Sequence, residues 1–215
     1  MPPRCEGGTA MIVTLYSTKG GCGKTTLALC LATYWAQKCR TVLVDADPQA
    51  SLELCGKETL DVPVVPDTSE DVGRTIGRLA KDYEHVIVDT AGFKRKKNLE
   101  ALTQADFVLI PCKPSPLDVR EARAAVALVR EIGESKQRKH RPLHHGIVLT
   151  MAQRTAITAQ IRQDLIASGM PIMSAQIGQR VAFVEMPIAG APQEDSVAAL
   201  EIKLLAKEIR RRAKA

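Results

Sequence analysis

A glycine-rich segment near the start of the chain carries the residue types that a phosphate-binding loop needs. Residues 18–26 have the sequence TKGGCGKTT, directly after an apolar run and before a stretch rich in leucine and alanine. Glycines let successive backbone N–H groups point at phosphate oxygens, and a helix N-terminus behind them favours negative charge. A lysine and a hydroxyl then serve the β- and γ-phosphates and Mg²⁺. This order of residue types predicts a nucleotide-phosphate site.

The match to the standard pattern G-x-x-x-x-G-K-[ST] is incomplete at one end. Gly23, Lys24 and Thr25 complete the pattern, but Thr18 stands where its first glycine is expected. A glycine-rich turn without a ligand is the alternative interpretation. The immediate succession of a strand, the glycines, Lys-Thr-Thr and a helix favours the phosphate site.

Aspartates stand at the ends of two later apolar runs. Asp45 and Asp47 follow the run VLV at residues 42–44, and Asp89 follows the run VIV at residues 86–88. An aspartate at the end of a buried strand beside a phosphate loop can hold Mg²⁺ directly or through water. Each aspartate taken alone also fits a helix N-cap or a turn. The order of the three motifs favours a site for Mg²⁺ and nucleotide.

These motifs fall on a regular alternation of predicted strands and helices. Continuous apolar runs, typical of strands buried on both faces, occupy residues 12–16, 41–44, 86–88, 107–110 and 146–149. Helical spacing of apolar residues marks residues 25–37, 71–81 and 117–132. The alternation predicts the α/β class, with a doubly wound, mostly parallel sheet flanked by helices. Ligands of such sheets gather at the carboxyl ends of the strands, where the loop and the aspartates fall.

The composition is that of a globular protein with an aliphatic core. Of the 215 residues, 45% are hydrophobic, 25% are charged and 3% are aromatic. These proportions exclude a disordered chain, a collagen-like repeat and a disulfide-stapled miniprotein, and the few aromatic rings argue against a platform for single-stranded nucleic acid. The net charge of +6 favours anionic partners, such as nucleic acid, an acidic membrane surface or phosphate ligands.

The cysteines and the start of the chain predict a cytoplasmic protein. The six cysteines include no C-x-x-C pair, so we expect reduced thiols. The first ten residues lack the apolar core of a secretory signal, and the longest apolar runs are far shorter than the ~20 residues of a membrane helix. We expect residues 1–10 to form a flexible tail and residues 11–215 to form a single domain that contains the phosphate loop, which the resemblance described next makes a P-loop ATPase domain.

The phosphate loop resembles the deviant Walker A motif, K-G-G-x-G-K-[ST]-T, of the ParA/MinD group of P-loop ATPases. A second lysine, here Lys19, distinguishes this motif, although on its own it could be a solvated surface residue. The resemblance implies a homodimer assembled by ATP, in which Lys19 crosses the interface to the phosphates bound by the other copy. It also implies that Lys24 is catalytic. The loop residues implied to bind nucleotide are Lys19, Gly20, Gly21, Cys22, Gly23, Lys24, Thr25 and Thr26.

Later segments extend the resemblance. The sequence DADPQ at residues 45–49 is similar to the A′ (switch I) motif of the family, and DTAG at residues 89–92 resembles its Walker B and switch II. By this resemblance Asp47 is catalytic because it orients the attacking water. Asp89 organises the Mg²⁺ shell and Asp45 supports it. The implied Mg²⁺ residues are Thr25, Asp45 and Asp89.

Two segments after the later strands are also similar to the family. The segment IPCKPSPLD, residues 110–118, corresponds to a proline-rich stretch that lies near the adenine and the dimer surface in the smaller plasmid-partition members. Prolines here also serve to end a strand and start a helix. Residues 149–155 resemble the segment after a late strand. These segments add Pro114 and Met151 to the implied nucleotide contacts.

Several other members of the wider class lack their sequence signatures here. A GTPase would carry an N-K-x-D motif, and none is present. An iron–sulfur scaffold would have a C-x-x-C near the C-terminus, but no cysteine follows Cys112. A bacterial tyrosine kinase would end in a tyrosine cluster, but no tyrosine follows Tyr83.

A MinD-like membrane-associated ATPase and a ParA-like DNA-associated ATPase remain. The MinD-like protein would end in an amphipathic helix with bulky apolar residues for lipid. Residues 197–215 contain no Phe or Trp, and their apolar positions suit docking on the sheet, so no membrane partner is expected.

The ParA-like alternative uses the basic excess to bind DNA without reading its sequence, since Lys and Arg contacts to phosphates suffice. The candidate basic runs are residues 94–97, 136–141 and 210–214. This resemblance implies an ATPase on the nucleoid with slow hydrolysis, stimulated by a ParB-like or cargo-adaptor protein. The expected DNA contacts are Arg180, Arg210, Arg211 and Lys214.

Overall fold

Seven parallel strands form one sheet in the order β3-β2-β4-β1-β5-β6-β7. The computed structural model describes residues 10–48, 52, 62–92, 96–138, 141–189, 192 and 196–214. The strands are β1 (Met11–Leu15), β2 (Thr41–Ala46), β3 (Val64–Pro66), β4 (His85–Thr90), β5 (Phe107–Cys112), β6 (His144–Ala152) and β7 (Ile172–Gly178). The predicted α/β class and parallel sheet are confirmed.

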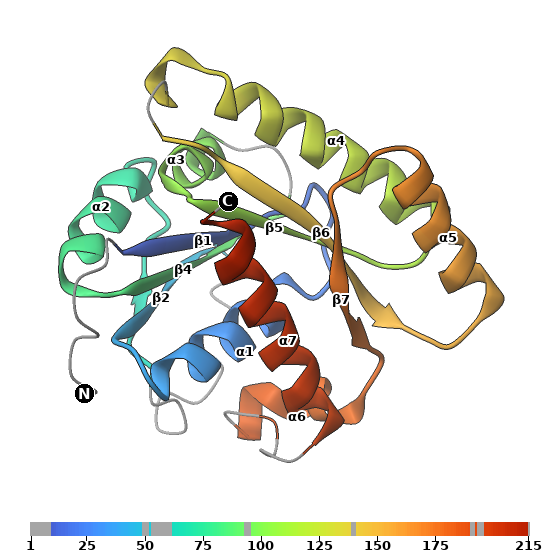
Figure 1. Ribbon diagram of the computed structural model, residues 1–215. Coiled ribbons are helices and arrows are strands. Elements are labelled where there is room, and N and C mark those ends of the chain that lie inside the picture. Colours follow the sequence, from blue (N-terminus) through green and yellow to red (C-terminus); the bar gives the residue numbers. More distant parts are fainter. Residues whose placement is uncertain are drawn as a thin grey trace.

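Helices connect the strands and cover both faces of the sheet (Figure 1). They are α1 (Lys24–Ala36), α2 (Val72–Asp82), α3 (Lys96–Gln104), α4 (Pro116–Gly133), α5 (Ala156–Ala167), α6 (Val181–Ala189) and α7 (Val197–Arg212), with a 3₁₀ turn η1 at Lys136–Arg138. One core layer joins the sheet to α1, α6 and α7. The opposite layer contains α2 to α5.

Successive side chains of the central strands point to opposite faces of the sheet, so each strand contributes residues to both core layers. In β5, Phe107 and Leu109 belong to the layer of α1 and α7, whereas Val108 and Ile110 face α4 and α5. Every residue of β2, β4 and β5 is buried, which explains why their sequences are continuous apolar runs. These three strands and β1 are neighbours at the centre of the sheet, and the phosphate loop follows β1.

Strand β7 lies at an edge of the sheet, and polar side chains of α7 cover its backbone. The Glu208 carboxylate accepts hydrogen bonds from the backbone N–H groups of Ser174 and Ala175, each at 2.9 Å. Arg212 donates to the Ile172 carbonyl at 2.7 Å and pairs with Glu208 at 2.8 Å. Helix α7 therefore docks on the sheet, as expected, partly by replacing a neighbouring strand.

Candidate nucleotide-binding site

The phosphate loop joins β1 to α1 at the carboxyl edge of the sheet. Gly21 and Gly23 have φ angles of 71° and 91°, in the left-handed region that favours glycine. A Cβ added at Gly20 or Gly23 would meet nothing within 4 Å, so the loop borders open space. Gly23 is also the N-cap of α1 and has no side chain to cap it. The first N–H groups of α1 are therefore suited to binding an anion.

The loop is organised around the carbonyl oxygen of Lys19. The Ser17 hydroxyl donates to it at 2.9 Å, and Lys24 Nζ donates to it at 3.3 Å. The buried thiol of Cys22 makes a 3.6 Å contact with the same oxygen. Thr150 ties the loop to β6 by donating to the Cys22 carbonyl at 2.9 Å. The loop is thus held in shape by its own side chains and by one strand.

Asp89 is fully buried beside the loop, and neither of its carboxylate oxygens has a hydrogen-bond partner in the described structure. Burial raises the pKa of Asp89 to about 7, against the opposing effects of the Thr25 hydroxyl and the Lys24 ammonium. A buried carboxylate without partners is costly unless a cation compensates it. Mg²⁺ fits this position because it is usually held by one or two carboxylates together with phosphate oxygens.

Asp45 uses its carboxylate mainly to hold the loop after β2. Its Oδ1 accepts from the backbone N–H of Asp47 at 3.1 Å, and its Oδ2 accepts from that of Leu52 at 3.3 Å. Asp45 is buried and Asp47 is half-buried. The structure thus brings Asp45, Asp47 and Asp89 to one edge of the sheet, as the sequence predicts, and their roles toward Mg²⁺ and water stay predictions.

Gly92 lies directly against the phosphate loop. A Cβ added at Gly92 would lie 3.3 Å from the backbone nitrogen of Gly20 and 3.4 Å from the carbonyl carbon of Lys19. Such spacing is tighter than ordinary side-chain contacts. The segment after β4 therefore needs a glycine to approach the loop this closely.

Met151, near the end of β6, and Pro114, just after β5, lie at the same edge of the sheet. Met151 has a φ of 51°, which is unusual for a residue other than glycine, and its side chain is 40% exposed. Pro114 is half-buried between β5 and α4. Both positions are compatible with contacts to a nucleotide, and these contacts stay predictions.

Three charged residues next to the loop were missed in the sequence. Lys19 Nζ pairs with Asp118 at 3.0 Å, Thr18 donates to Glu121 at 2.7 Å, and Lys113 Nζ lies near Gly21. The signal for Asp118 was the segment PSPLD, in which Ser115 caps α4 and accepts from the backbone N–H of Asp118. Ion pairs between residues that are far apart in the sequence leave no local sequence pattern by which they could be predicted.

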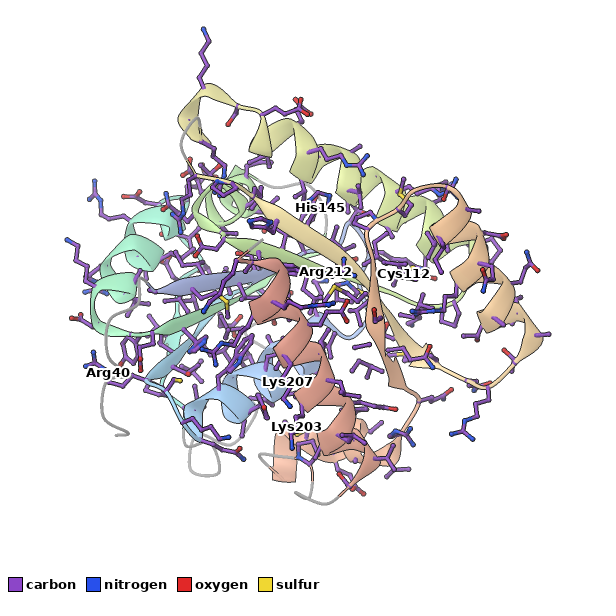
Figure 2. The ribbon with its side chains drawn as sticks, viewed as in Figure 1. Arg40, Cys112, His145, Lys203, Lys207 and Arg212 are labelled. Carbon is purple, nitrogen blue, oxygen red and sulfur yellow. The ribbon has the colours of Figure 1, made fainter. Side chains whose placement is uncertain are left out.

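The predicted DNA contacts differ in their surroundings. Arg180 is engaged by Glu201, to whose two carboxylate oxygens it donates at 3.1 and 2.6 Å. Arg210, Arg211 and Lys214 are exposed on or just after α7. Figure 2 shows two further lysines, Lys203 and Lys207, that project from the same helix.

Two other basic runs are less suited to contacting DNA, or lie outside the description. Arg138 in the run 136–141 is buried, and its guanidinium donates to the backbone carbonyls of Thr103, Ala105 and Pro142. Arg141 pairs with Asp106 at 2.7 Å. These two arginines support the fold, whereas the sequence placed them in a candidate DNA-binding run. The side chains of the run 94–97 lie outside the described residues, as do residues 1–9 of the expected tail.

Comparison with known proteins identifies the family. The model of the CobQ/CobB/MinD/ParA nucleotide binding domain matches residues 13–193. The chain belongs to this family. It is 33% identical over 180 residues to "Protein ParA" of Rhizobium radiobacter, covering 80% of each protein, and 27% identical over 188 residues to a maintenance of carboxysome distribution protein A of Halothiobacillus neapolitanus, covering 84% and 85%.

Solved structures share the fold. A putative plasmid partition protein from Borrelia burgdorferi bound to AMPPNP superposes with a TM-score of 0.77 at 18% identity, covering 94% of this chain and 99% of the other. The septum site-determining protein MinD of Pyrococcus horikoshii, complexed with Mg-ADP, gives 0.74 at 17% identity, covering 93% and 96%. These bound molecules agree with ATP and Mg²⁺ as the expected cofactors. Within the described part of this chain, no helix combines the length and apolarity needed to span a bilayer.

Proposed function

We propose that this protein is an ATPase that forms an ATP-bridged homodimer, binds DNA without sequence specificity and positions or segregates a cargo. The observation that carries the proposal is the pairing of an open phosphate loop with a second lysine, Lys19, at its entrance. Lys24, buried at the start of α1, is placed to serve phosphates within the loop. The side chain of Lys19 is partly exposed, and it is the lysine that we propose reaches the phosphates on another copy.

Exposed apolar side chains around the loop support the dimer. Leu117, Met151 and Ile157 are 60%, 40% and 56% exposed, at the start of α4, the end of β6 and the start of α5. All three lie at the carboxyl edge of the sheet, the edge that holds the phosphate loop. A second copy placed face to face would cover them, as exposed apolar patches commonly mark interaction surfaces.

The residues around the loop support slow hydrolysis. Bound Mg²⁺ would neutralise charge that develops on the transferred phosphoryl group. Lys24 adds positive charge at the phosphates, and Asp47 orients the attacking water. No residue assigned to the site is a strong general base, so we expect a low rate that a partner protein stimulates.

The names of the relatives suggest only the general class of the cargo and of its adaptor protein. Their names include a ParA and a protein that maintains carboxysome distribution. A cargo such as a plasmid or chromosome partition complex, or a protein assembly, and a ParB-like or cargo-binding adaptor therefore belong to this proposal. The nucleoid is the matching location, since exposed cations gather on α7.

Sedimentation velocity tests the dimer, with AMPPNP and with ADP. Wild-type protein should dimerise with AMPPNP, and Lys19→Ala should bind the nucleotide but stay monomeric. Mobility shift of random duplex DNA and pelleting with anionic liposomes then separate the ParA-like function from a MinD-like one. Exposed Leu200 and Leu204 on α7 are the feature that would favour lipid. An AMPPNP-dependent shift of DNA without liposome pelleting supports the proposal, and the reverse result contradicts it.

A further inference from the structure

Helix α4 contacts the start of the phosphate loop at two consecutive residues. Lys19 Nζ lies 3.0 Å from Asp118 Oδ2, and Thr18 Oγ1 donates to Glu121 Oε2 at 2.7 Å. Asp118 and Glu121 are three residues apart, so both side chains lie on one face of the helix. In this structure Lys19 is therefore held by its own protomer.

The two partners of this ion pair differ in solvent exposure. The side chain of Asp118 is 6% exposed, whereas that of Lys19 is 44% exposed. Ser115 caps α4 by accepting from the Asp118 backbone N–H, and its hydroxyl also bonds to the Asp118 carboxylate. A carboxylate in the first turn of a helix is stabilised by the helix dipole. Asp118 is thus a fixed anion, and Lys19 is the partner that can leave.

A second cation stands beside Asp118. Lys113 Nζ lies 4.0 Å from the position that a Cβ on Gly21 would occupy, next to the loop. Burial raises the pKa of Asp118, but the Ser115 hydroxyl, Lys19 and Lys113 outweigh this effect and lower it. The carboxylate is therefore ionised at neutral pH. If Lys19 leaves, Ser115 and Lys113 still compensate the charge, so the exchange avoids the penalty of an unpaired buried anion.

We propose that Asp118 is the intramolecular counter-ion that holds Lys19 on its own protomer until the nucleoside triphosphate of a second copy displaces it. This inference rests on the proposed ATP-bridged dimer. A triphosphate presents several negative charges where Asp118 presents one, and a diphosphate presents fewer. The fraction of protein in which Asp118 holds Lys19 lowers the apparent affinity of dimerisation. The ion pair thereby makes dimerisation selective for the triphosphate.

Sedimentation velocity of Asp118→Asn measures the effect. The dimer dissociation constant with AMPPNP should fall by about fivefold, since a partly exposed ion pair is removed. Dimers should also form with ADP at a lower protein concentration than in the wild type. Glu131→Gln is the matched control, because it removes an exposed charge from the same helix, away from the loop, and leaves the Lys19–Asp118 pair. It should change the dissociation constant much less.

A double mutant isolates the pair. In the Lys19→Ala background, Asp118→Asn should give no gain in dimerisation, because there is no lysine to release. Thermal unfolding confirms that the variants fold, and Asp118→Ser replaces Asp118→Asn if the latter does not.

The outcomes separate the two proposals. If wild-type protein stays monomeric with AMPPNP, the ATP-bridged dimer and the counter-ion are both wrong. If the wild type dimerises through Lys19 while Asp118→Asn dimerises equally or more weakly, only the counter-ion role is overturned. Equal gains from Asp118→Asn and Glu131→Gln would also overturn it.

Discussion

Asp45 of β2 and Asp89 of β4 are direct partners in adjacent parallel strands. The register places two carboxylates side by side at the edge of the sheet, and the charge of Asp45 contributes to the raised pKa of Asp89. Asp45 is compensated by the backbone N–H groups of Asp47 and Leu52, whereas Asp89 has no such partner in the described structure. This asymmetry makes Asp89 the carboxylate that benefits most from a bound cation.

Removing the charge of Asp89 should change how stability depends on pH. Its pKa rises from 3.8 to about 7 on folding, so the unfolded chain loses this proton at lower pH than the folded protein. Without nucleotide and Mg²⁺, wild-type stability should therefore fall between about pH 4 and 7, by on the order of 4 kcal/mol. Denaturant unfolding in EDTA should show this loss reduced in Asp89→Asn. The exposed control Asp71→Asn should behave like the wild type. If Asp89→Asn shows the same pH profile as the wild type, the raised pKa of Asp89 is wrong.

Lys24→Ala should abolish nucleotide binding. The variant loses the only lysine of the loop that is buried. The affinity for ATP should therefore drop by about 100-fold or more, because charge-assisted hydrogen bonds between the lysine and the phosphates are lost. Isothermal titration calorimetry with AMPPNP measures it. Lys207→Ala, an exposed change on α7, should bind normally. Unchanged affinity in Lys24→Ala would refute the phosphate-loop assignment.

Asp47→Ala should separate binding from hydrolysis. The variant should bind ATP and dimerise, but release phosphate at least tenfold more slowly, because general-base or water-positioning groups contribute at least that much. Phosphate release and co-elution with duplex DNA are the measurements. A trapped DNA-bound dimer is expected, and rapid turnover would show that another residue orients the water.

Arg180 and Arg211 should respond differently in DNA binding and in stability. Arg211 is exposed, so Arg211→Ala should reduce the slope of log affinity against log salt by about one and leave the melting temperature unchanged. Arg180→Ala should also lower the melting temperature, because Glu201 loses the partner that it holds at 2.6 Å. If Arg180→Ala leaves the slope of log affinity against log salt unchanged, Arg180 stabilises the fold and does not contact DNA.

Glu208→Gln should destabilise the edge of the sheet. The carboxylate accepts from two backbone N–H groups of β7 and pairs with Arg212, so its loss should cost about 2–4 kcal/mol at pH 7. Although burial raises the pKa of Glu208, these partners lower it below its usual 4.5. The stabilisation is therefore present above about pH 4.5 and is lost on acidification, as denaturant unfolding at several pH values can verify. Glu131→Gln, on the exposed face of α4, is the control.

Local sequence patterns predicted the strands and the loop that form the nucleotide site. They could not predict contacts between residues that are far apart in the sequence. Strands that are buried on both faces have continuous apolar sequences, and the glycines of a phosphate loop have a fixed order. The sequence therefore predicted the loop and the strands β1, β2, β4, β5 and β6. The short strand β3 ends in a proline, and only two of the seven residues of the edge strand β7 are buried, so neither shows such a run. Asp118 meets Lys19 across 99 residues, and only the fold brings them together.

Burial also decides what a basic run can do. Arg138 and Arg141 look in the sequence like part of a solvated cationic patch. In the fold, one guanidinium caps three backbone carbonyls and the other pairs with Asp106. Charge alone could not separate these arginines from Arg210 and Arg211, because the difference lies in which neighbours the chain brings to them.

The covered backbone of β7 constrains how copies of this protein can assemble. Strand addition to a sheet needs a row of available N–H and C=O groups at its edge. Here Glu201, Glu208 and Arg212 already occupy such groups along β7. A strand of another chain that added to this edge, the route to fibrils, would therefore first have to displace side chains of the same molecule.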